Sequence, residues 1–214
     1  MTIRINIGCG QNPTNGWQNF DNTPSIKLAR SPIKTLLLKT FGLLNKAQLE
    51  NIEWNKIHNI KFTDATKNIP FENSSVDIVN TSHMLEHLSR NGAKKFLYES
   101  LRILKNDGVL RISVPDLSKY IDKYLLDKDA NAFMSNTYIS APSLETFKEK
   151  LRLIFVGYRH HQWMYDGASL SKLLLEVGFK KAIIQESGKT CIDDLGELNL
   201  YKKHGQSVYV EAIK

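Results

Sequence analysis

The chain has 214 residues, of which 42% are hydrophobic and 24% charged, the composition of a soluble globular protein large enough for one well-filled domain. Its net charge of +7 favours anionic partners such as nucleic acid, phosphorylated substrates or acidic lipid, although basic residues also serve solubility alone. Two cysteines exclude a disulfide framework and a four-cysteine zinc site, and the sequence shows neither a signal-peptide pattern nor an apolar run of ~20 residues, so we expect a cytoplasmic protein.

Strand-like and helix-like segments alternate along the chain. The predicted strands cover residues 3–7, 17–20, 57–62, 76–80, 109–114, 182–185 and 208–213. The predicted helices cover residues 90–105, 116–126 and 166–178. The turn "NDG" at 106–108 is expected to stop the first of these helices, and Gly178 the last. This alternation predicts an α/β fold with a mostly parallel sheet covered on both faces.

The segment "RINIGCGQNP", residues 4–13, runs from the first strand into a glycine-rich turn. A dinucleotide-binding fingerprint needs glycine at the sixth position of this loop, where the chain has Pro13. The acidic residue of that fingerprint lies ~20 residues further on, whereas Asp21 comes thirteen residues after Gly8. The dinucleotide interpretation is therefore weakened, and the loop either lets the backbone approach another ligand or is only a tight turn.

Several segments in order resemble the motifs of class I S-adenosylmethionine-dependent methyltransferases. They are "INIGCGQNP", "NFD", "FTDAT", "IPFENSSVDIVNTSHMLEHL" and "LRILKNDGVLRISVPD", which together cover about residues 3–116. The compressed "GCG…GW.N.D" spacing is also similar to small predicted methyltransferases of glycan-biosynthesis type. The resemblance implies a single Rossmann-like domain over 1–214, with a doubly wound sheet of seven strands, mostly parallel with an antiparallel last strand.

The resemblance also implies S-adenosylmethionine as the cofactor. The cofactor-binding positions that it assigns are Gly8, Cys9, Gly10, Gln11, Asp21, Asp64, Ala65 and Ser82. The glycine loop would wrap the methionine part, Asp21 would accept both ribose hydroxyls, and Asp64 with Ala65 would frame the adenine. Only residues 8–16 separate the first two strands, fewer than a parallel crossover usually needs, so we expect the first helix to be reduced to a turn or lost.

The segment "HMLEH", residues 83–87, has two interpretations. It fits the H-x-x-E-H pattern of zinc peptidases, in which His83 and His87 would lie one helical turn apart and Glu86 would act as base. The segment follows a predicted strand in the methyltransferase order, however, and no third ligand stands out, so we expect no metal. His83 lies at the carboxyl end of the fourth strand, where ligands bind in open α/β sheets, and is either a general base or a packing residue.

The segment "YRHHQWMYD", residues 158–166, is rich in aromatic and histidine residues. Such rings suit a binding wall for a sugar or another ring compound, and His161 would orient or deprotonate the acceptor. The alternative is a loop that only packs. This segment closes a substrate-side helical and loop region expected at about 117–166.

Residues 24–50 form a basic helical insert, with no acidic residue before Glu50. Ser31 and Pro32 are a suitable cap and first-turn residue for a helix. An apolar stripe follows at helical spacing, made of Ile33, Leu36, Leu37, Phe41 and Leu44. The insert would cover the sheet, form a lid over the site, or lie on an acidic membrane surface through residues 26–46.

We interpret the chain as an S-adenosylmethionine-dependent methyltransferase of a small hydroxyl-bearing or glycan-type acceptor, with O-methylation favoured and His83 and His161 addressing the acceptor. RNA methylation is less favoured, because the chain lacks an appended recognition domain and a basic stripe with interleaved aromatic residues. A non-catalytic cofactor-binding protein is a further alternative, since a fold does not fix a function. The identity of the acceptor and the oligomeric state do not follow from the sequence.

Overall fold

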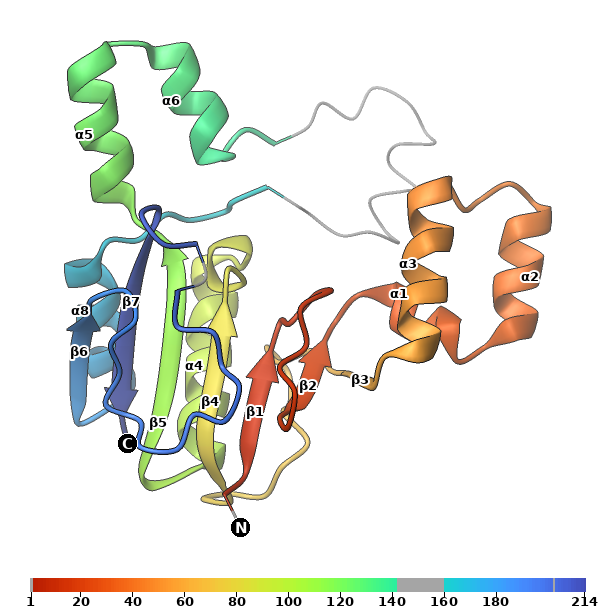
Figure 1. The fold of residues 1–214 in the computed structure, drawn as a ribbon, viewed down its shortest axis with the longest axis horizontal. Coiled ribbons are helices and arrows are strands. Elements are labelled where there is room, and N and C mark those ends of the chain that lie inside the picture. Colours follow the sequence, from red (N-terminus) through yellow and green to blue (C-terminus); the bar gives the residue numbers. More distant parts are fainter. Residues whose placement is uncertain (1, 142–159, 202) are drawn as a thin grey trace.

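A computed structural model describes residues 2–141, 160–201 and 203–214. Its centre is a seven-stranded sheet in the order β3-β2-β1-β4-β5-β7-β6 (Figure 1). The strands are β1 (Arg4–Ile7), β2 (Gln18–Asp21), β3 (Ile60–Phe62), β4 (Val76–Ser82), β5 (Leu104–Pro115), β6 (Lys181–Gln185) and β7 (Ser207–Ile213). Only β7 runs antiparallel to its neighbours, which confirms the predicted sheet. The strand order reverses between β1 and β4, and ligands bind at such a switch point in open α/β sheets.

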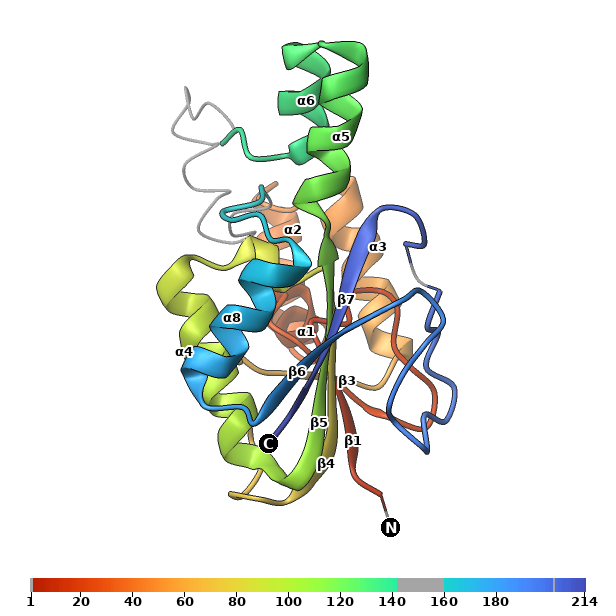
Figure 2. The ribbon, with the colours of Figure 1, turned by 90° about the vertical axis from the view of Figure 1, so that its left-hand side faces the viewer.

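The helices lie around this sheet. They are α1 (Pro24–Ala29), α2 (Pro32–Thr40), α3 (Lys46–Ile57), the 3₁₀ turn η1 (Leu85–His87), α4 (Arg90–Ile103), α5 (Leu117–Asp127), α6 (Ala130–Thr137) and α8 (Gly167–Val177). Figure 2 shows α4 and α8 side by side on one face of the sheet. The start and end of α8 were predicted from sequence: the Asp166 side chain accepts from the Ser169 N–H, and Gly178 ends the helix in the left-handed conformation.

Three local predictions meet different outcomes. Residues 8–17 connect β1 to β2 without a helix, as the short crossover predicts. The third strand was predicted too long, because Ile57 ends α3 and β3 begins at Ile60. The "NDG" turn does not end α4, which stops at Ile103. It lies inside β5 as an irregularity of register opposite Val76 and Ile78.

The helix-covered face of the sheet is apolar. Its buried core includes Ile5, Ile7, Phe20, Val79, Phe96, Leu97, Leu110, Val210, Leu170 and Leu174. Side chains of α4 and α8 recur here at helical spacing, so each helix presents one apolar stripe to the strands. Burial of this stripe supplies the main favourable free energy that holds the helices on the sheet.

The opposite face carries a row of buried polar side chains. Five register partners on neighbouring strands form it, and they are Asn19, Asn6, Asn80, Arg111 and Glu211. The Asn80 amide donates to Asn6 at 3.0 Å, the Asn6 amide donates to Asn19 at 3.3 Å, and Arg111 forms an ion pair with Glu211. We call these five residues the polar row. Because its members bond to one another, a polar line crosses the sheet with few unsatisfied groups.

An irregular segment, residues 186–201 and 203–206, covers part of this face, as Figure 2 shows on the side away from α4 and α8. Within it, the Cys191 N–H donates to Glu211 at 2.7 Å and the Thr190 hydroxyl at 2.6 Å. Burial alone would raise the pKa of Glu211, but hydrogen bonds from Cys191 and Thr190 and from Arg111 lower it. The sheet is thus covered by α4 and α8 on one face, and on the other in part by this irregular segment and, beside β3, by α1 and α3.

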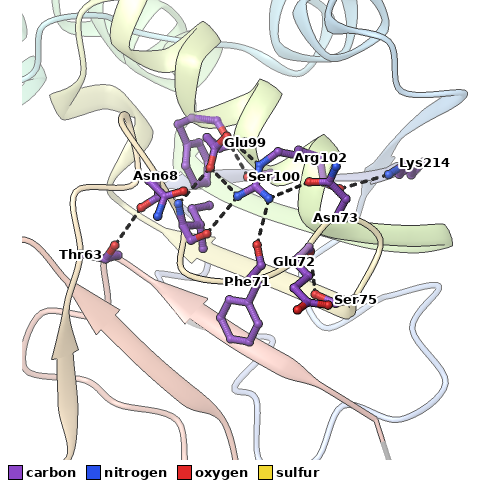
Figure 3. Close-up of polar contacts among 12 residues, drawn as sticks. Thr63, Asn68, Phe71, Glu72, Asn73, Ser75, Glu99, Ser100, Arg102 and Lys214 are labelled. Carbon is purple, nitrogen blue, oxygen red and sulfur yellow. Dashed lines mark hydrogen bonds and ion pairs between the residues drawn. The ribbon is translucent and has the colours of Figure 1, made fainter.

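Arg102 on α4 is hydrogen bonded to the segment that connects β3 and β4 (Figure 3). Its guanidinium donates to the carbonyls of Phe71 at 2.9 Å and Ile69 at 3.0 Å, and to both oxygens of Glu99 at 2.8 and 2.9 Å. The paired guanidinium lowers the pKa of Glu99, an effect larger than the opposing effect of burial. This network fixes the chain that leads into β4, the strand that His83 directly follows.

The basic insert departs from one expectation. No residue of α2 is buried, and Ile33, Leu36 and Phe41 remain 74%, 64% and 73% exposed, so the apolar stripe does not cover the sheet. Figure 1 shows α2 beyond α3, away from the strands. Ser31 occupies the cap position but its side chain accepts no capping hydrogen bond. In the described ranges, no helix combines the length and apolar character needed to cross a membrane.

Candidate functional site

The glycine loop follows β1 at the edge of the sheet where the parallel strands end (Figure 1). The N–H groups of Gly8 and Cys9 donate to the Phe20 carbonyl at 2.8 and 3.2 Å, which holds the loop against β2. Gly8 has φ +72°, and an added Cβ would lie 2.5 Å from Cγ of Met84. Gly10 has φ +55° with no atom within 4 Å of an added Cβ. Gly8 therefore serves internal packing, whereas Gly10 leaves its backbone open to a ligand.

Asp21, at the end of β2, contacts this loop directly. Its Oδ2 accepts from the Gly10 N–H at 2.9 Å, and its Oδ1 accepts from the Thr23 N–H at 2.8 Å and from the Thr23 hydroxyl. A carboxylate offers about four lone-pair positions, so one remains on Oδ2. Asp21 thus orders the loop and keeps acceptor capacity for one further donor.

Next to Asp21 lies a pocket of about 550 Å³, a size typical of small-molecule sites. The pocket lies between the glycine loop and α3. Its lining residues are Gly10, Gln11, Asn12, Asp21, Thr23, Ile26, Asn45, Ala47, Gln48, Glu50, Asn51 and Asn55. The Gln11 amide donates to Asn51 at 3.2 Å and links the loop to α3. Of the three interpretations of the insert, the lid is the one that α3 supports, because α3 forms one wall of this pocket.

The amides of α3 were missed in the sequence. Gln48, Asn51 and Asn55 recur at spacings of three and four, which places amides on one face of a helix. Asn45 and Gln48 also form a capping box, in which each side chain accepts from the other's N–H. The helical spacing of these amides was the signal in the sequence, but only the apolar stripe of the same insert was used to interpret it.

Cys9 and Ser82 lie near the loop, but their side chains do not line the pocket. Cys9 is buried in a small cluster with Ile26 and Ile60, so its backbone alone belongs to the loop face. Ser82 ends β4, where its hydroxyl lies 3.0 Å from that of Ser113 on β5. The geometry brings neither side chain to the pocket that Gly10 and Asp21 line.

Asp64 and Ala65 follow β3 on the other side of β2. Asp64 accepts from the Thr66 N–H and hydroxyl, at 3.2 and 2.7 Å, and pairs with Lys67 at 3.0 Å. Burial would raise the pKa of Asp64, but these hydrogen bonds and the lysine lower it. Ala65 belongs to the main core. Both lie outside the lining of the described pocket, so their contact with adenine stays a prediction.

His83 is the first residue after β4 and has φ +53°, a conformation uncommon outside glycine. Its N–H donates to the Ser113 carbonyl at 2.9 Å. The ring lies between two partners, with Nε2 2.9 Å from the Ser207 hydroxyl and Nδ1 3.2 Å from Oε1 of Glu86. A carboxylate only accepts, so the proton is assigned to Nδ1 and the lone pair to Nε2. Carboxylate, imidazole and hydroxyl thus form one line at the carboxyl end of the sheet.

Glu86 is fully buried, and neither carboxylate oxygen accepts a hydrogen bond from the described residues. Its own carbonyl accepts from the N–H groups of Gln162 and Trp163 at 2.7 and 3.2 Å. The zinc-peptidase geometry is wrong for this segment, because His83 precedes the single 3₁₀ turn that contains His87. The two histidines are therefore not one turn apart on an α-helix.

His161 comes to Glu86 from a distant part of the chain. Its N–H donates to the Tyr138 carbonyl at 2.8 Å, and its ring meets that of His87 edge-on with centroids 5.0 Å apart. Burial lowers the pKa of His161 despite the opposing charge of Glu86, so its imidazole is neutral at pH 7. One ligand atom each of Glu86, His87 and His161 lies within 4.8 Å of the other two. This cluster was not foreseen, because spacing along the chain gave no third ligand.

The other residues of the predicted aromatic wall differ in whether they are described and in how exposed they are. Tyr158 and Arg159, like all of residues 142–159 in the expected substrate-side region, lie outside the described residues. Tyr165 is buried, with 1% of its surface exposed. Trp163 remains 44% exposed and lies under the Arg90 guanidinium, 4.8 Å from the ring centroid. Trp163 is therefore the described aromatic side chain of this segment that an acceptor can reach.

Comparison with known proteins agrees with this arrangement. Residues 40–112 match the model of a methyltransferase domain, and the sequence matches no curated protein at a significant level. A SAM-dependent methyltransferase from Thermotoga maritima has a TM-score of 0.55 at 15% identity, over 100% of this chain and 83% of its own. One from Archaeoglobus fulgidus has a TM-score of 0.53 at 15% identity, over 100% and 86%.

A third structure, a complex of DhpI with SAM and HEP, has a TM-score of 0.51 at 11% identity, over 99% of this chain and 78% of its own. At these identities the likeness shows the fold, which is that of class I methyltransferases. Residues 40–112 thus match a methyltransferase domain, and the chain as a whole has the fold of these S-adenosylmethionine-dependent methyltransferases.

Proposed function

We propose that this chain transfers a methyl group from S-adenosylmethionine to a hydroxyl group of a small or glycan-type acceptor, with His83 as the general base. The observation that carries the proposal is the line of Glu86, His83 and Ser207 at the carboxyl end of β4. The donor supplies an electrophilic methyl group on a sulfonium. The protein must then place the acceptor in line and remove a proton, and positioning accounts for much of the acceleration.

The pocket beside the glycine loop suits the donor. The open backbone at Gly10 permits close approach, the remaining acceptor position on Asp21 suits one ribose hydroxyl, and the amides of Asn51 and Asn55 offer further polar contacts. The binding roles of Cys9, Gln11, Asp64, Ala65 and Ser82 remain predictions. Of these, Gln11 has the strongest support, because it lines the pocket.

The surroundings of His83 support its role as base. The fully buried Glu86 carboxylate faces Nδ1, where it stabilises the imidazolium that forms when Nε2 takes a proton. The His83 side chain keeps 21% of its surface exposed, so an acceptor hydroxyl can compete with Ser207 for Nε2. His161, proposed to orient the acceptor, lies on the far side of Glu86 against His87.

The test of the base is His83→Gln. Loss of a general base lowers turnover by roughly 10²–10⁴-fold, and the variant should bind S-adenosylmethionine with unchanged affinity by calorimetry because His83 does not line the donor pocket. His204→Gln is the matched control, since His204 is exposed and lies in the segment that precedes β7. Wild-type turnover in His83→Gln would exclude the base.

The acceptor class is tested with labelled donor. Protein and methyl-labelled S-adenosylmethionine are incubated separately with hydroxylated metabolites, with soluble glycans and with RNA. We expect label in a hydroxyl-bearing small or glycan acceptor. Label in RNA alone would overturn the acceptor class, and donor binding without transfer to any pool would favour a non-catalytic binding protein.

A further inference from the structure

The side chain of Glu86 lacks the partners that a buried carboxylate needs. It has no exposed surface, and neither oxygen accepts a hydrogen bond from the described residues. An ionised carboxylate without hydrogen bonds or a countercharge is strongly disfavoured in a protein interior. Nδ1 of His83 lies 3.2 Å from one oxygen, which leaves the other without any described partner. Glu86 is therefore a site for a cation.

Two imidazoles offer free nitrogens toward this carboxylate. Nδ1 of His87 lies 3.2 Å from the His160 carbonyl, so it carries the proton and Nε2 keeps its lone pair. His161 is hydrogen bonded to the backbone of Thr137, while its buried Nδ1 lacks a hydrogen-bond partner among the described residues. In both rings, one nitrogen thus donates its proton to a backbone carbonyl and the other nitrogen keeps a lone pair that can bind a metal. This is the arrangement found for histidine ligands of metals.

The backbone fixes these three residues relative to one another. The Gln162 N–H donates to the Glu86 carbonyl at 2.7 Å, and the Gln162 side chain donates to the His87 carbonyl at 2.7 Å. These bonds join η1 to the segment around His161, although the two lie more than 70 residues apart in sequence. The cluster is therefore held by main-chain hydrogen bonds to Glu86 and by the Gln162 side chain on His87.

We propose that Glu86, His87 and His161 bind one divalent transition-metal ion of the zinc type, whose open coordination position receives the acceptor hydroxyl beside His83. Two imidazoles and one carboxylate favour zinc and similar ions over magnesium or calcium, which prefer oxygen ligands alone. Three protein ligands with an open position are the pattern of catalytic rather than structural zinc sites. The ligand atoms lie within 4.8 Å of one another, and tetrahedral zinc with bonds of about 2.0–2.1 Å holds its ligand atoms about 3.3 Å apart, so the widest separation must close by up to about 1.5 Å.

This inference deepens the proposed function and rests on it for the identity of the acceptor. A hydroxyl bound to such an ion loses its proton more readily. That proton passes to Nε2 of His83, the acceptor oxygen forms a bond to the methyl carbon, and the methyl–sulfur bond breaks with its electron pair retained by sulfur. The products are the methylated acceptor and S-adenosylhomocysteine, with His83 protonated until it releases the proton to solvent.

The first experiment measures metal binding without catalysis. Untagged, chelator-treated protein is titrated with Co²⁺ and, separately, with Zn²⁺ by calorimetry. We expect one equivalent of each, with visible d–d absorption for Co²⁺. Glu86→Gln and His161→Gln should weaken binding by roughly 100-fold or more, whereas the exposed-histidine control His204→Gln should not. Absence of binding by the wild type, or equal binding by Glu86→Gln and His161→Gln, would overturn the site.

A second measurement separates a metal ligand from a structural carboxylate. In metal-free protein, Glu86→Gln removes an under-partnered buried charge, so its melting temperature should match or exceed that of the wild type. Zn²⁺ should then raise the melting temperature of the wild type and leave that of Glu86→Gln unchanged. If Glu86 served only to pair with a protonated His83, Glu86→Gln would instead lower the melting temperature and Zn²⁺ would change neither protein.

Donor binding distinguishes the failure of this inference from that of the proposed function. Calorimetry with S-adenosylmethionine is run on the same metal-free and Zn²⁺-loaded samples. Donor binding without metal binding overturns the metal site alone. Metal binding without donor binding overturns the methyltransferase proposal and leaves the ion site to be explained by another activity.

Discussion

Gly8 and Gly10 both have positive φ, but their surroundings differ. At Gly8 a side chain would collide with Met84, whereas at Gly10 it would point into open space beside the donor pocket. The sequence motif predicted both glycines, because a ligand loop needs backbone that other residues rarely adopt. The motif could not tell packing from ligand approach, since the partner of Gly8 comes from the segment after β4.

We predict that Gly8→Ala and Gly10→Ala separate these roles. Both introduce a side chain at positive φ, and Gly8→Ala adds a 2.5 Å contact with Cγ of Met84. Gly8→Ala should lose about 1–3 kcal/mol of unfolding free energy in urea, and Gly10→Ala less. Gly10→Ala should instead weaken S-adenosylmethionine binding measured by calorimetry. Equal stability losses with unchanged donor affinity in both variants would contradict this assignment.

For the site histidines, the sequence predicted the position of a residue but not its distant partners. His83 was expected at the end of β4 because the strand pattern located that end. Its partner Ser207 is 124 residues away, and His161 lies close to Glu86 although residues 142–159, which the structure does not describe, come between them in the sequence. Such pairs depend on how loops return to the sheet edge, which hydrophobic periodicity does not encode.

Among the elements, long periodic segments were predicted well and short or inserted ones less so. The helices predicted at 90–105, 116–126 and 166–178 appear as α4, α5 and α8, with Asp116 and Asp166 as caps of the last two. The insert was harder, because α2 satisfies every local rule of an amphipathic helix yet packs its apolar side on nothing described. Local pattern fixes the periodicity of a helix, whereas tertiary contacts decide which surface meets it.

The exposed side of α2 leads to a prediction about lipid. Ile33, Leu36 and Phe41 are exposed, and the basic residues Lys34 and Lys39 lie on the same helix without acidic neighbours. We predict binding to anionic vesicles that weakens with salt, because screening reduces the attraction of the lysines to the surface.

Co-sedimentation measures this binding. Phe41→Ser, at the residue that follows α2, should reduce the bound fraction, and Leu125→Ser should not, since Leu125 is an exposed apolar residue on α5. Equal binding to neutral and anionic vesicles, or no binding to either, would refute the role of α2 as a lipid contact.

For the whole molecule, buried and paired carboxylates set the response to acid. The pKa values of Asp64, Asp77, Glu99 and Glu211 all lie below their ordinary values of 3.8 for aspartate and 4.5 for glutamate. Burial acts against this at all four and is the largest single influence at Asp64, Asp77 and Glu211, but hydrogen bonds and lysine or arginine partners together outweigh it. At Glu99 the Arg102 contact is itself the largest influence. A lowered pKa means that the folded state binds protons less readily than the unfolded state.

We therefore predict that the stabilisation from these groups is complete above the ordinary carboxyl pKa values and is lost as pH falls through the lower values of the folded protein. Urea unfolding from pH 7 to pH 3 should show the free energy of unfolding decline below about pH 4.5. Glu99→Gln should be less stable than the wild type at pH 7 and should decline less on acidification. A flat profile in the wild type would contradict the pairing described here.

The irregular cover of the sheet has a practical consequence for protein engineering. Connecting segments usually accept insertions, but residues 189–191 are hydrogen bonded to the polar row. The Lys189 carbonyl accepts from Arg111, and the Thr190 hydroxyl and the Cys191 N–H donate to Glu211. A fluorescent reporter or peptide tag inserted there would uncover Arg111 and Glu211. The turn between α5 and α6 at Lys128 is the better place, because α5 has no buried residue and that turn is exposed. A label in this turn would leave the sheet intact and lie beyond the carboxyl ends of β4 and β5 (Figure 1).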